Sequence, residues 1–373
     1  MAPPGWKIRW IGWRNRVIGD PVFQHWAARL PLVRRVARSR ASRLFDLLAG
    51  FTYSQVLLAA VESGLLDLLG EGPATLSAIA GRTSLPEVAA LRLVRAATAL
   101  DIAEEVSNGC WMLGQQGAAL HTNRGAQAMI RHHRLLYDDL ADPLALLRAN
   151  RSETTALSEF WRYAAQAHPG DLRNEGYDEY SELMATTQAM VCQQALGAYD
   201  FGQHRSVLDV GGGHGTFASA LAAAYPHLRL GIVDLPQVLE GTGARLRGTA
   251  FEDRVTLHPA DFFRDPLPMG YDCITLVRIL HDHDDEPALR LLHSARGALG
   301  PGGRIMIAEP MAETSGAIAM GDAYFGMYLW AMRQGRPRSA DEIAGILESA
   351  GFTHARHVTT AQPVVLSVVV ACS

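Results

Sequence analysis

Val207-Leu-Asp-Val-Gly-Gly-Gly-His-Gly-Thr216 is the stretch that decides the expected fold of this chain of 373 residues. Its first four residues predict a short buried strand, and the glycines predict a sharp turn into a helix over 216–225. Glycine permits a left-handed backbone and lets a ligand lie against bare main chain, so Gly211 and Gly213 are candidate ligand contacts. A second predicted strand ends at Asp234, the usual position of an acid that binds ribose hydroxyls.

The acids around this loop separate two classes of nucleotide-like ligand. Asp209, directly before the glycines, would repel a pyrophosphate but suits the ammonium group of an amino acid. After a third predicted strand, Asp261 and Phe262 offer a carboxylate and an aromatic face to an adenine ring. Adenine, ribose and an amino-acid head without phosphate describe S-adenosylmethionine, which we expect as the cofactor. A nicotinamide-dependent Rossmann domain is the alternative, because similar glycine spacing occurs there.

Five motifs occur in a fixed order: Asp-Val-Gly-Gly-Gly-His-Gly (209–215), Val-Asp-Leu-Pro (233–236), Asp-Phe-Phe (261–263), Leu-His-Asp-His-Asp-Asp-Glu (280–286) and Pro-Gly-Gly-Arg-Ile-Met-Ile-Ala-Glu-Pro (301–310). Together they resemble the class I O-methyltransferases that act on small molecules, over residues 45–373. The resemblance implies a Rossmann-like α/β sheet of seven strands, an N-terminal helical dimerisation domain, and a homodimer. It implies cofactor contacts at Asp209, Gly211, Gly213, Asp234, Leu235, Asp261 and Phe262.

A hydroxyl group attacks a methyl donor poorly while it keeps its proton, so the reaction needs a general base, and histidine is the natural candidate. The resemblance places that base at His281 and an acid that orients it at Glu309. Asp282 is expected to cap the next helix or to position the loop. The alternative for His281 is a structural or helix-capping histidine.

The run His281-Asp-His283 is a poor metal signature, because its two histidines lie two residues apart with no third ligand near in sequence. The resemblance also implies catalysis without a metal. His283 replaces a tryptophan common in plant members, and we interpret it as a pocket residue. Plant members have a second catalytic-site glutamate where this chain has Pro337, so only the pair His281 and Glu309 is expected here.

The acceptor is inferred from features outside the shared motifs. The Trp/Arg-rich N-terminus and Phe51-Thr-Tyr-Ser-Gln-Val resemble the carotenoid branch of the family. That branch implies a hydroxylated carotenoid of the hydroxyneurosporene or demethylspheroidene type, a hydrophobic molecule. The alternative for the acceptor is a phenolic, polyketide or tetrapyrrole molecule. The alternative for the protein class is a cofactor-binding protein without catalytic activity. Candidate pocket residues, with ordinary helix packing as the other interpretation, are Trp161, Tyr180, Met184 and His283.

The first fifty residues are strongly basic, with ten Lys/Arg and only two acids, whereas the whole chain has a net charge of −4. Trp6, Trp10 and Trp13 are spaced to form one stripe on a helix, with cations on either side. Tryptophan flanked by long cations is typical of a helix in a membrane interface, so residues 1–40 predict peripheral membrane contact. The alternative is an arm packed on its own domain or on a dimer partner.

Residues 75–117 predict a winged helix-turn-helix, with a hairpin turn at Ser107-Asn-Gly109. The second of its helices has Arg92 and Arg95 against Glu87, too few cations to neutralise many phosphates, so we expect no nucleic-acid partner. Residues 126–200 predict helices with an irregular middle near His168–Asp171.

After residue 202 strands and helices alternate, which indicates a mostly parallel sheet. The expected strands are 206–210, 228–233, 254–258, 271–277, 303–308, about 354–359 and 364–371, the last two forming a hairpin. Ligands bind at the carboxyl ends of such strands, which is where Asp209, Asp234, Asp261, His281 and Glu309 fall.

The chain is expected to divide into a basic arm (1–41), a winged-helix dimerisation domain (42–125), a helical acceptor-pocket region (126–202) and the cofactor-binding domain (203–373). Four scattered cysteines without a CxxC pair suit a reducing cytosol, and we expect a cytoplasmic protein. With no apolar run of eighteen residues and no secretory h-region, neither a spanning helix nor a signal peptide is expected.

Overall fold

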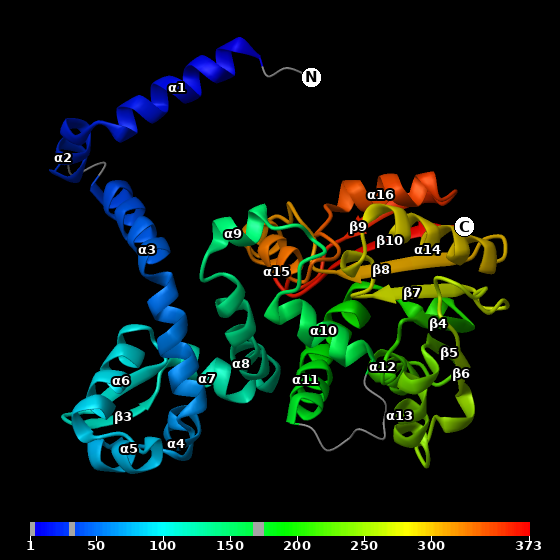
Figure 1. Ribbon diagram of the computed structural model, residues 1–373, viewed down its shortest axis with the longest axis horizontal. Helices are drawn as coiled ribbons and strands as arrows, with labels where there is room; N and C mark the ends of the chain where they lie inside the picture. The colour runs from blue at the N-terminus through cyan, green and yellow to red at the C-terminus, as the bar shows by residue number, and fades with distance from the viewer. Residues whose placement is uncertain (1–3, 30–33, 167–174) are drawn as a thin grey trace. The chain divides into compact units, whose positions relative to one another are not determined.

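The computed structural model describes residues 4–29, 34–166 and 175–373, and for residues 162–186 it describes at most the backbone (Figure 1). The chain divides into two compact units, residues 1–121 and 122–373. The finer division into four segments stays a prediction.

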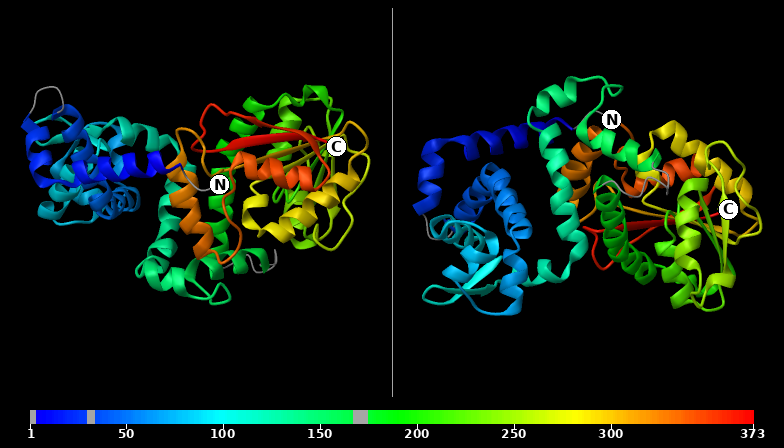
Figure 2. Two further views of the ribbon diagram at one scale, coloured as in Figure 1. Left: turned by 90° about the horizontal axis from the view of Figure 1, so that it is seen from above. Right: turned by 60° about the horizontal axis from the view of Figure 1, so that its bottom comes forward.

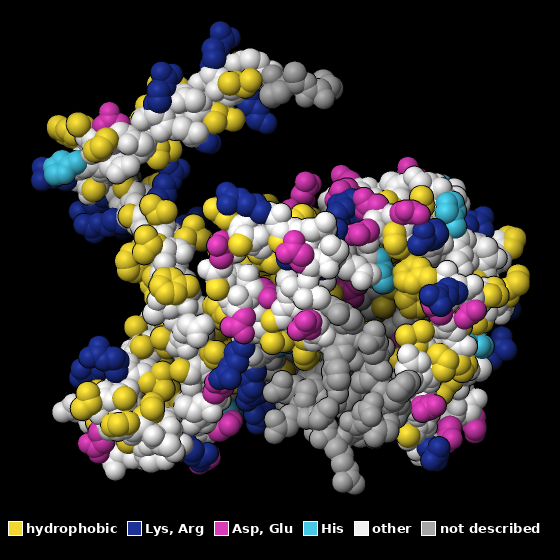
Figure 3. All heavy atoms as spheres, viewed as in Figure 1, with side chains coloured by type: hydrophobic (Ala, Val, Ile, Leu, Met, Phe, Trp, Pro, Cys, Tyr) yellow, Lys and Arg dark blue, Asp and Glu magenta, His cyan; other side chains and the backbone are white. Residues whose placement is uncertain are grey.

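The first unit begins with three helices, α1 (Gly5–Gly19), α2 (Pro21–Arg29) and α3 (Arg34–Glu62). The predicted stripe lies on α1, where Trp6, Trp10 and Trp13 are 66%, 52% and 58% exposed. Among the fifteen residues of α1, all described, none is buried within this chain. The guanidinium of Arg14 lies 5.3 Å from the ring centre of Trp10. Apolar and basic side chains therefore share the surface of the arm (Figure 3).

Helix α3 differs from the sequence expectation about membrane spans. Within the described residues it is the one helix whose length and composition would allow it to cross a membrane, and only 17% of its most apolar window is buried. A single helix near the N-terminus that passes this test is weak evidence for a span. Its exposed apolar residues are Val36, Leu44, Phe45, Leu47, Leu48 and Phe51.

The rest of the first unit is the predicted winged helix. Helices α4 (Leu65–Glu71), α5 (Leu76–Thr83) and α6 (Glu87–Ala99) precede the hairpin of β2 (Ala103–Ser107) and β3 (Cys110–Leu113). Strand β1 (Ala74–Thr75) pairs with the other side of β3, and α7 (Gln115–Thr122) follows. Buried Ile79, Val94 and Trp111 form part of its core, and the predicted arrangement is confirmed.

The second unit opens with helices, as expected: α8 (Arg124–Asp139), α9 (Pro143–Arg148), α10 (Ala156–Gln166) and α11 (Glu175–Ala198). The predicted irregular segment His168–Asp171 lies outside the described residues. Asn123 caps α8, because its side-chain oxygen accepts the Ala126 N–H at 3.0 Å.

A seven-stranded sheet follows, in the order β6-β5-β4-β7-β8-β10-β9. Six strands run in the same direction, and β10 is antiparallel to both its neighbours, β8 and β9. The predicted seven strands and the terminal hairpin are confirmed. Their bounds are β4 (Ser206–Val210), β5 (Arg229–Asp234), β6 (Val255–Pro259), β7 (Cys273–Val277), β8 (Arg304–Glu309), β9 (Thr353–Val358) and β10 (Ser367–Cys372).

Helices cover both faces of this sheet (Figures 1 and 2). One core contains side chains of α11, α12 (Thr216–Ala224) and α13 (Pro236–Leu246), and the other contains those of α14 (Asp285–Ala298) and α16 (Ala340–Ser349). Neighbouring strand residues serve opposite faces: Val207 belongs to the first core and Leu208 to the second. Because both faces of the central strands β4, β7 and β8 are buried, these strands are mostly apolar.

Candidate active site

The carboxyl ends of the parallel strands share one edge of the sheet, and the five predicted residues lie along it. Asp209 is the fourth residue of β4, and Asp234 and Glu309 end β5 and β8. Asp261 follows β6 by two residues, and His281 lies in the short 3-10 helix η4 (Leu280–Asp282) after β7. Strand order changes direction between β4 and β7, the position where open α/β sheets bind ligands.

The glycine loop after β4 has an open side. Gly211, Gly213 and Gly215 have φ of 72°, 54° and 75°, which only glycine adopts without strain. A Cβ atom at Gly213 would meet nothing within 4 Å, whereas one at Gly211 would collide with the side chain of Ile279. The loop therefore offers bare backbone to a ligand at Gly213 and is closed by protein at Gly211.

Asp234 connects the loop to the end of β5. One of its carboxylate oxygens accepts the Gly213 N–H and the other accepts the Leu235 N–H, both at 2.8 Å. Burial raises the pKa of this carboxyl, and the two N–H groups oppose that effect. Each oxygen keeps a lone pair beyond these bonds, so the carboxylate can also accept ribose hydroxyls.

Asp209 lies beneath the loop. Its Oδ1 accepts the Thr275 hydroxyl at 2.8 Å, and its Oδ2 has no hydrogen-bond partner in the described part of the chain. Burial raises the pKa of this carboxyl to about 7. A buried acid with an unpaired oxygen next to an open loop is suited to a cationic group.

Asp261 and Phe262 lie on the other side of the loop. Phe262 is near enough to Gly211 that a Cβ there would be 3.6 Å from its ring. Phe263 contacts the ring of His283 edge-on, with 4.7 Å between centres. Asp261 accepts the Phe263 N–H at 3.0 Å and pairs with Arg264 at 3.4 Å. His283 thus belongs to the aromatic group beside the loop, and its Nδ1 contacts the Gln334 amide at 3.0 Å.

His281 is 3% exposed, and its ring has neighbours on three sides. Nε2 lies 3.1 Å from Asp282 Oδ1, and Nδ1 lies 4.0 Å from Glu309 Oε2. Phe325 stacks on the ring, with 6.0 Å between centres and an angle of 27°. Glu309 also accepts the His281 backbone N–H at 3.0 Å, so β8 fixes the main chain of the loop.

Electrostatics favour protonation of His281. Burial alone would lower its pKa, but the carboxylate of Asp282 and then that of Glu309 raise the pKa above the usual value for histidine. Burial raises the pKa of Glu309, against the effect of His281. The expectation that Asp282 caps the next helix is wrong, because the N-cap of α14 is Asp284 and Asp282 contacts the histidine ring instead.

A polar aromatic network next to His281 did not emerge from the sequence. A π-helical turn, η5 (Ala319–Phe325), runs into α15 (Gly326–Ala331) and presents Tyr324, Phe325 and Tyr328. The hydroxyls of Tyr324 and Tyr328 bond to His133 and His132 of α8 at 2.7 and 2.8 Å. Such turns are frequent at functional sites but leave no sequence pattern.

Of the four predicted pocket residues, Trp161 joins this network, since its indole N–H donates to the Tyr328 hydroxyl at 3.1 Å. The side chains of Tyr180 and Met184 lie outside the described residues. His283 lies in the aromatic group beside Asp261 and Phe262, as described above.

Comparison with known proteins assigns this chain to a family. A family model of the O-methyltransferase domain matches residues 137–353, and a model of the O-methyltransferase dimerisation domain matches residues 45–123. The chain belongs to the O-methyltransferase family.

Its similarity to characterised members is extensive. It is 40% identical to demethylspheroidene O-methyltransferase of Cereibacter sphaeroides, over 95% of this chain and 93% of that protein. It is 41% identical to the protein of the same name from Rhodobacter capsulatus, over 91% and 84%. The solved structure of CalO1, a calicheamicin-biosynthesis methyltransferase with S-adenosylhomocysteine bound, matches with a TM-score of 0.76 at 27% identity, over 89% and 98%. The chain is therefore an S-adenosylmethionine-dependent O-methyltransferase with a dimerisation domain.

The residues at the sheet edge of this O-methyltransferase fit its cofactor. The open backbone at Gly213, the carboxylate of Asp234 and the unpaired oxygen of Asp209 supply surfaces for an amino-acid head and a ribose. Within the described residues no group of three or more His, Cys, Asp or Glu side chains has the arrangement of a metal site.

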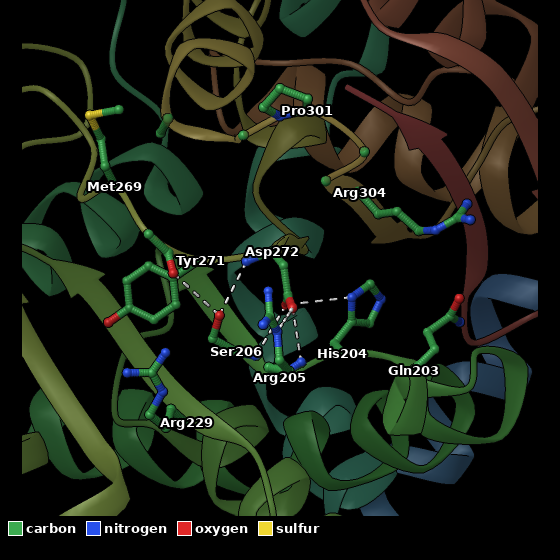
Figure 4. Close-up of a pocket in the computed structure, with 15 residues that line it drawn as sticks. Gln203, His204, Arg205, Ser206, Arg229, Met269, Tyr271, Asp272, Pro301 and Arg304 are labelled. Atoms are coloured by element: carbon green, nitrogen blue, oxygen red, sulfur yellow. Dashed lines mark hydrogen bonds and ion pairs between the residues drawn. The ribbon is translucent and has the colours of Figure 1, made fainter.

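A separate cavity of about 730 Å³ lies at the opposite, amino ends of the strands (Figure 4). There Asp272 accepts the backbone N–H groups of Arg205 and Ser206 at 2.9 and 3.0 Å. None of the predicted site residues lines it. Its polar contacts join the amino ends of the strands, and the predicted site residues lie at the other edge of the sheet.

Proposed function

We propose that this O-methyltransferase transfers a methyl group from S-adenosylmethionine to a hydroxyl of a hydroxylated carotenoid, with His281 as the general base. The observation that carries the proposal is the buried His281 ring, held between Asp282 and Glu309 at the cofactor edge of the sheet. The carotenoid class is supported by the two relatives at 40% and 41% identity, both named for demethylspheroidene.

The cofactor is held by the residues that surround the glycine loop. Gly213 and Leu235 supply main chain, Asp234 accepts ribose hydroxyls, and Asp209 attracts the ammonium group. Gly211, which is closed by Ile279, turns the chain into the loop. Asp261 and Phe262 contact the adenine ring. Bound S-adenosylmethionine would supply an electrophilic methyl group on a sulfonium, whose sulfur would leave as a neutral thioether when the acceptor oxygen bonds to the methyl carbon.

The residues of the chain handle the proton. His281 Nδ1 carries its hydrogen towards Glu309, which leaves the Nε2 lone pair to accept the proton of the acceptor hydroxyl. The positive charge of the protonated ring is then balanced by Asp282, whose Oδ1 lies 3.1 Å from Nε2, and by Glu309. Asp282 is 38% exposed, so the proton can pass from there to solvent. The half-buried ring of Phe325 covers one face of the base and keeps water from that face, which matters for an alcohol much less acidic than a phenol.

We infer that the N-terminal arm brings the enzyme to the cytoplasmic face of a membrane, where a carotenoid is dissolved. Exposed Trp6, Trp10 and Trp13 with neighbouring cations support this location. The dimerisation domain at 45–123 supports a homodimer, in which two arms would bind lipid together.

Methyl transfer from labelled S-adenosylmethionine tests the proposal. The enzyme is assayed in detergent with hydroxylated carotenoids and, in parallel, with a phenolic panel. We expect label on the carotenoid hydroxyl. Label on phenols alone would leave the fold, the cofactor and the base in place and would remove the carotenoid acceptor.

A further inference from the structure

Arg338 is completely buried, with 0% exposure, although it carries a permanent charge. Burying a guanidinium is costly unless its donors are satisfied and its charge is balanced. Within the described residues, the hydrogen-bond partners of this side chain all lie in one segment, residues 280–285.

Two of these contacts bond the two ends of the loop Leu280–His283, which contains His281. One terminal nitrogen of Arg338 donates to the Leu280 carbonyl at 2.8 Å, and the other donates to the His283 carbonyl at 2.8 Å. Leu280 and His283 are the residues directly before and after the pair His281-Asp282. The planar guanidinium thus sets the distance between the two ends of the loop.

The charge of Arg338 is balanced at the same place. Asp285 Oδ1 accepts from Nε at 3.0 Å and from a terminal nitrogen at 2.7 Å. Asp285 opens α14, so the arginine also ties the loop to the first turn of that helix.

The backbone next to Arg338 holds the middle of the loop. The Arg336 N–H donates to the His281 carbonyl at 2.9 Å. Gly335, at φ 75°, approaches so closely that a Cβ there would collide with the same carbonyl. Three carbonyls of the loop are therefore bonded by the segment 336–338.

The ring of His281 depends on this support. Its nitrogens have one close side-chain contact, to Asp282, which is itself part of the loop. Glu309 holds the His281 N–H from one side, and residues 336–338 hold the carbonyls from the other. A change in the loop backbone would move Nε2 and Asp282 together relative to the acceptor.

We infer that Arg338 is a positioning residue for methyl transfer: its guanidinium fixes the Leu280–His283 loop and so aims the His281 base and Asp282 at the acceptor hydroxyl. This role rests on the proposed function of His281. A residue that merely stabilises the fold would have the same contacts but would affect turnover regardless of whether His281 is present.

A double-mutant cycle separates the two roles. Methyl transfer is measured with saturating labelled S-adenosylmethionine in the wild type, Arg338→Leu, His281→Ala and the double variant, together with cofactor Kd and unfolding temperature. Arg338→Leu should lower kcat roughly 10- to 100-fold, the scale of a misplaced catalytic group. Its cofactor Kd should stay within about threefold, less than 1 kcal/mol. In the His281→Ala background it should lower the residual rate less than about twofold.

A conservative variant and a control variant keep the test informative if Arg338→Leu does not fold. Arg338→Lys keeps the charge but cannot bond two carbonyls and Asp285 at once, so its kcat should lie between those of the wild type and Arg338→Leu. If Arg338→Leu does not fold, Arg338→Lys replaces it in the cycle. Arg290→Leu is the control, because it removes an exposed arginine ion pair of 2.6 Å on α14 that touches no loop carbonyl. Its kcat should be unchanged.

Equal losses from Arg338→Leu in both backgrounds, or an unchanged kcat in the wild-type background, would overturn the positioning role. Neither result would contradict the proposal that His281 is the general base. Conversely, near-normal turnover of His281→Ala alone would remove the proposed base, and with it the role of Arg338.

Discussion

At the scale of single residues, the ionisation of His281 is set by Asp282. Burial favours the neutral ring, but the carboxylate of Asp282, 3.1 Å from Nε2, and that of Glu309 together outweigh burial and raise the pKa above the usual value. A general base works only in its neutral form, so kcat should rise with pH as His281 loses its proton.

Asp282→Asn should therefore shift the acidic limb of the kcat–pH profile to lower pH. The amide keeps the size of the side chain but removes the negative charge that holds the proton on His281. The plateau should also fall, since the protonated ring loses the negative charge that stabilises it. Profiles of the wild type and the variant with one acceptor provide the measurement, and a limb that stays in place or moves to higher pH contradicts the assignment.

The residues that the sequence placed at the sheet edge share one property: each ends or closely follows a recognisable strand. Asp234, His281 and Glu309 are of this kind. Arg338, Tyr324 and the ring contact of Asp282 could not be predicted, because they depend on which side chains meet across the fold. Arg338 contacts a loop more than fifty residues earlier in the chain. What draws attention to Arg338 is that its charge is completely buried, and the sequence does not show which residues are buried.

At the scale of elements, the strands were predictable because continuous apolar runs between glycine and proline turns define them. The segment 206–210 was predicted and observed with the same bounds. The π-helical turn η5 and the exposure of the apolar face of α3 were not predictable, since neither a helical irregularity nor the absence of a packing partner leaves a periodic signal.

Gly213→Ala tests the glycine loop, with Gly248→Ala as its matched control. Both glycines have positive φ, 54° and 76°, and a Cβ at either meets nothing within 4 Å of protein. Both variants should therefore lose about 1–2 kcal/mol of unfolding free energy to backbone strain.

Only Gly213→Ala should weaken S-adenosylmethionine binding, by roughly tenfold or more, about 1.4 kcal/mol, because its methyl group occupies the open side of the loop. Calorimetric titration of both variants measures the difference. Equal cofactor affinity in the two would place the ligand elsewhere.

At the scale of the whole molecule, charge and apolar exposure concentrate at one end of the sequence. Ten Lys/Arg against two acids in the first fifty residues contrast with the net charge of −4 for the chain. The basic composition and the spacing of the tryptophans predicted this arm and its helix. They did not determine which surface the arm binds.

Deletion of residues 1–18 should weaken sedimentation with vesicles that contain anionic lipid, while the unfolding temperature of the remaining protein stays close to that of the full chain. The tryptophans and cations of α1 are lost, and α1 has no buried residue to leave a gap. Neutral vesicles and a salt series serve as controls. Unchanged partitioning would show that the arm has a structural role instead.

The most direct test of the account is methyl transfer by His281→Ala at saturating S-adenosylmethionine and acceptor, with cofactor Kd measured on the same sample. We predict that kcat falls by about 10²- to 10⁴-fold, the usual contribution of a general base, while Kd stays near that of the wild type. Turnover close to the wild-type rate, or a loss explained entirely by failed cofactor binding, would contradict the assignment of His281 as the base.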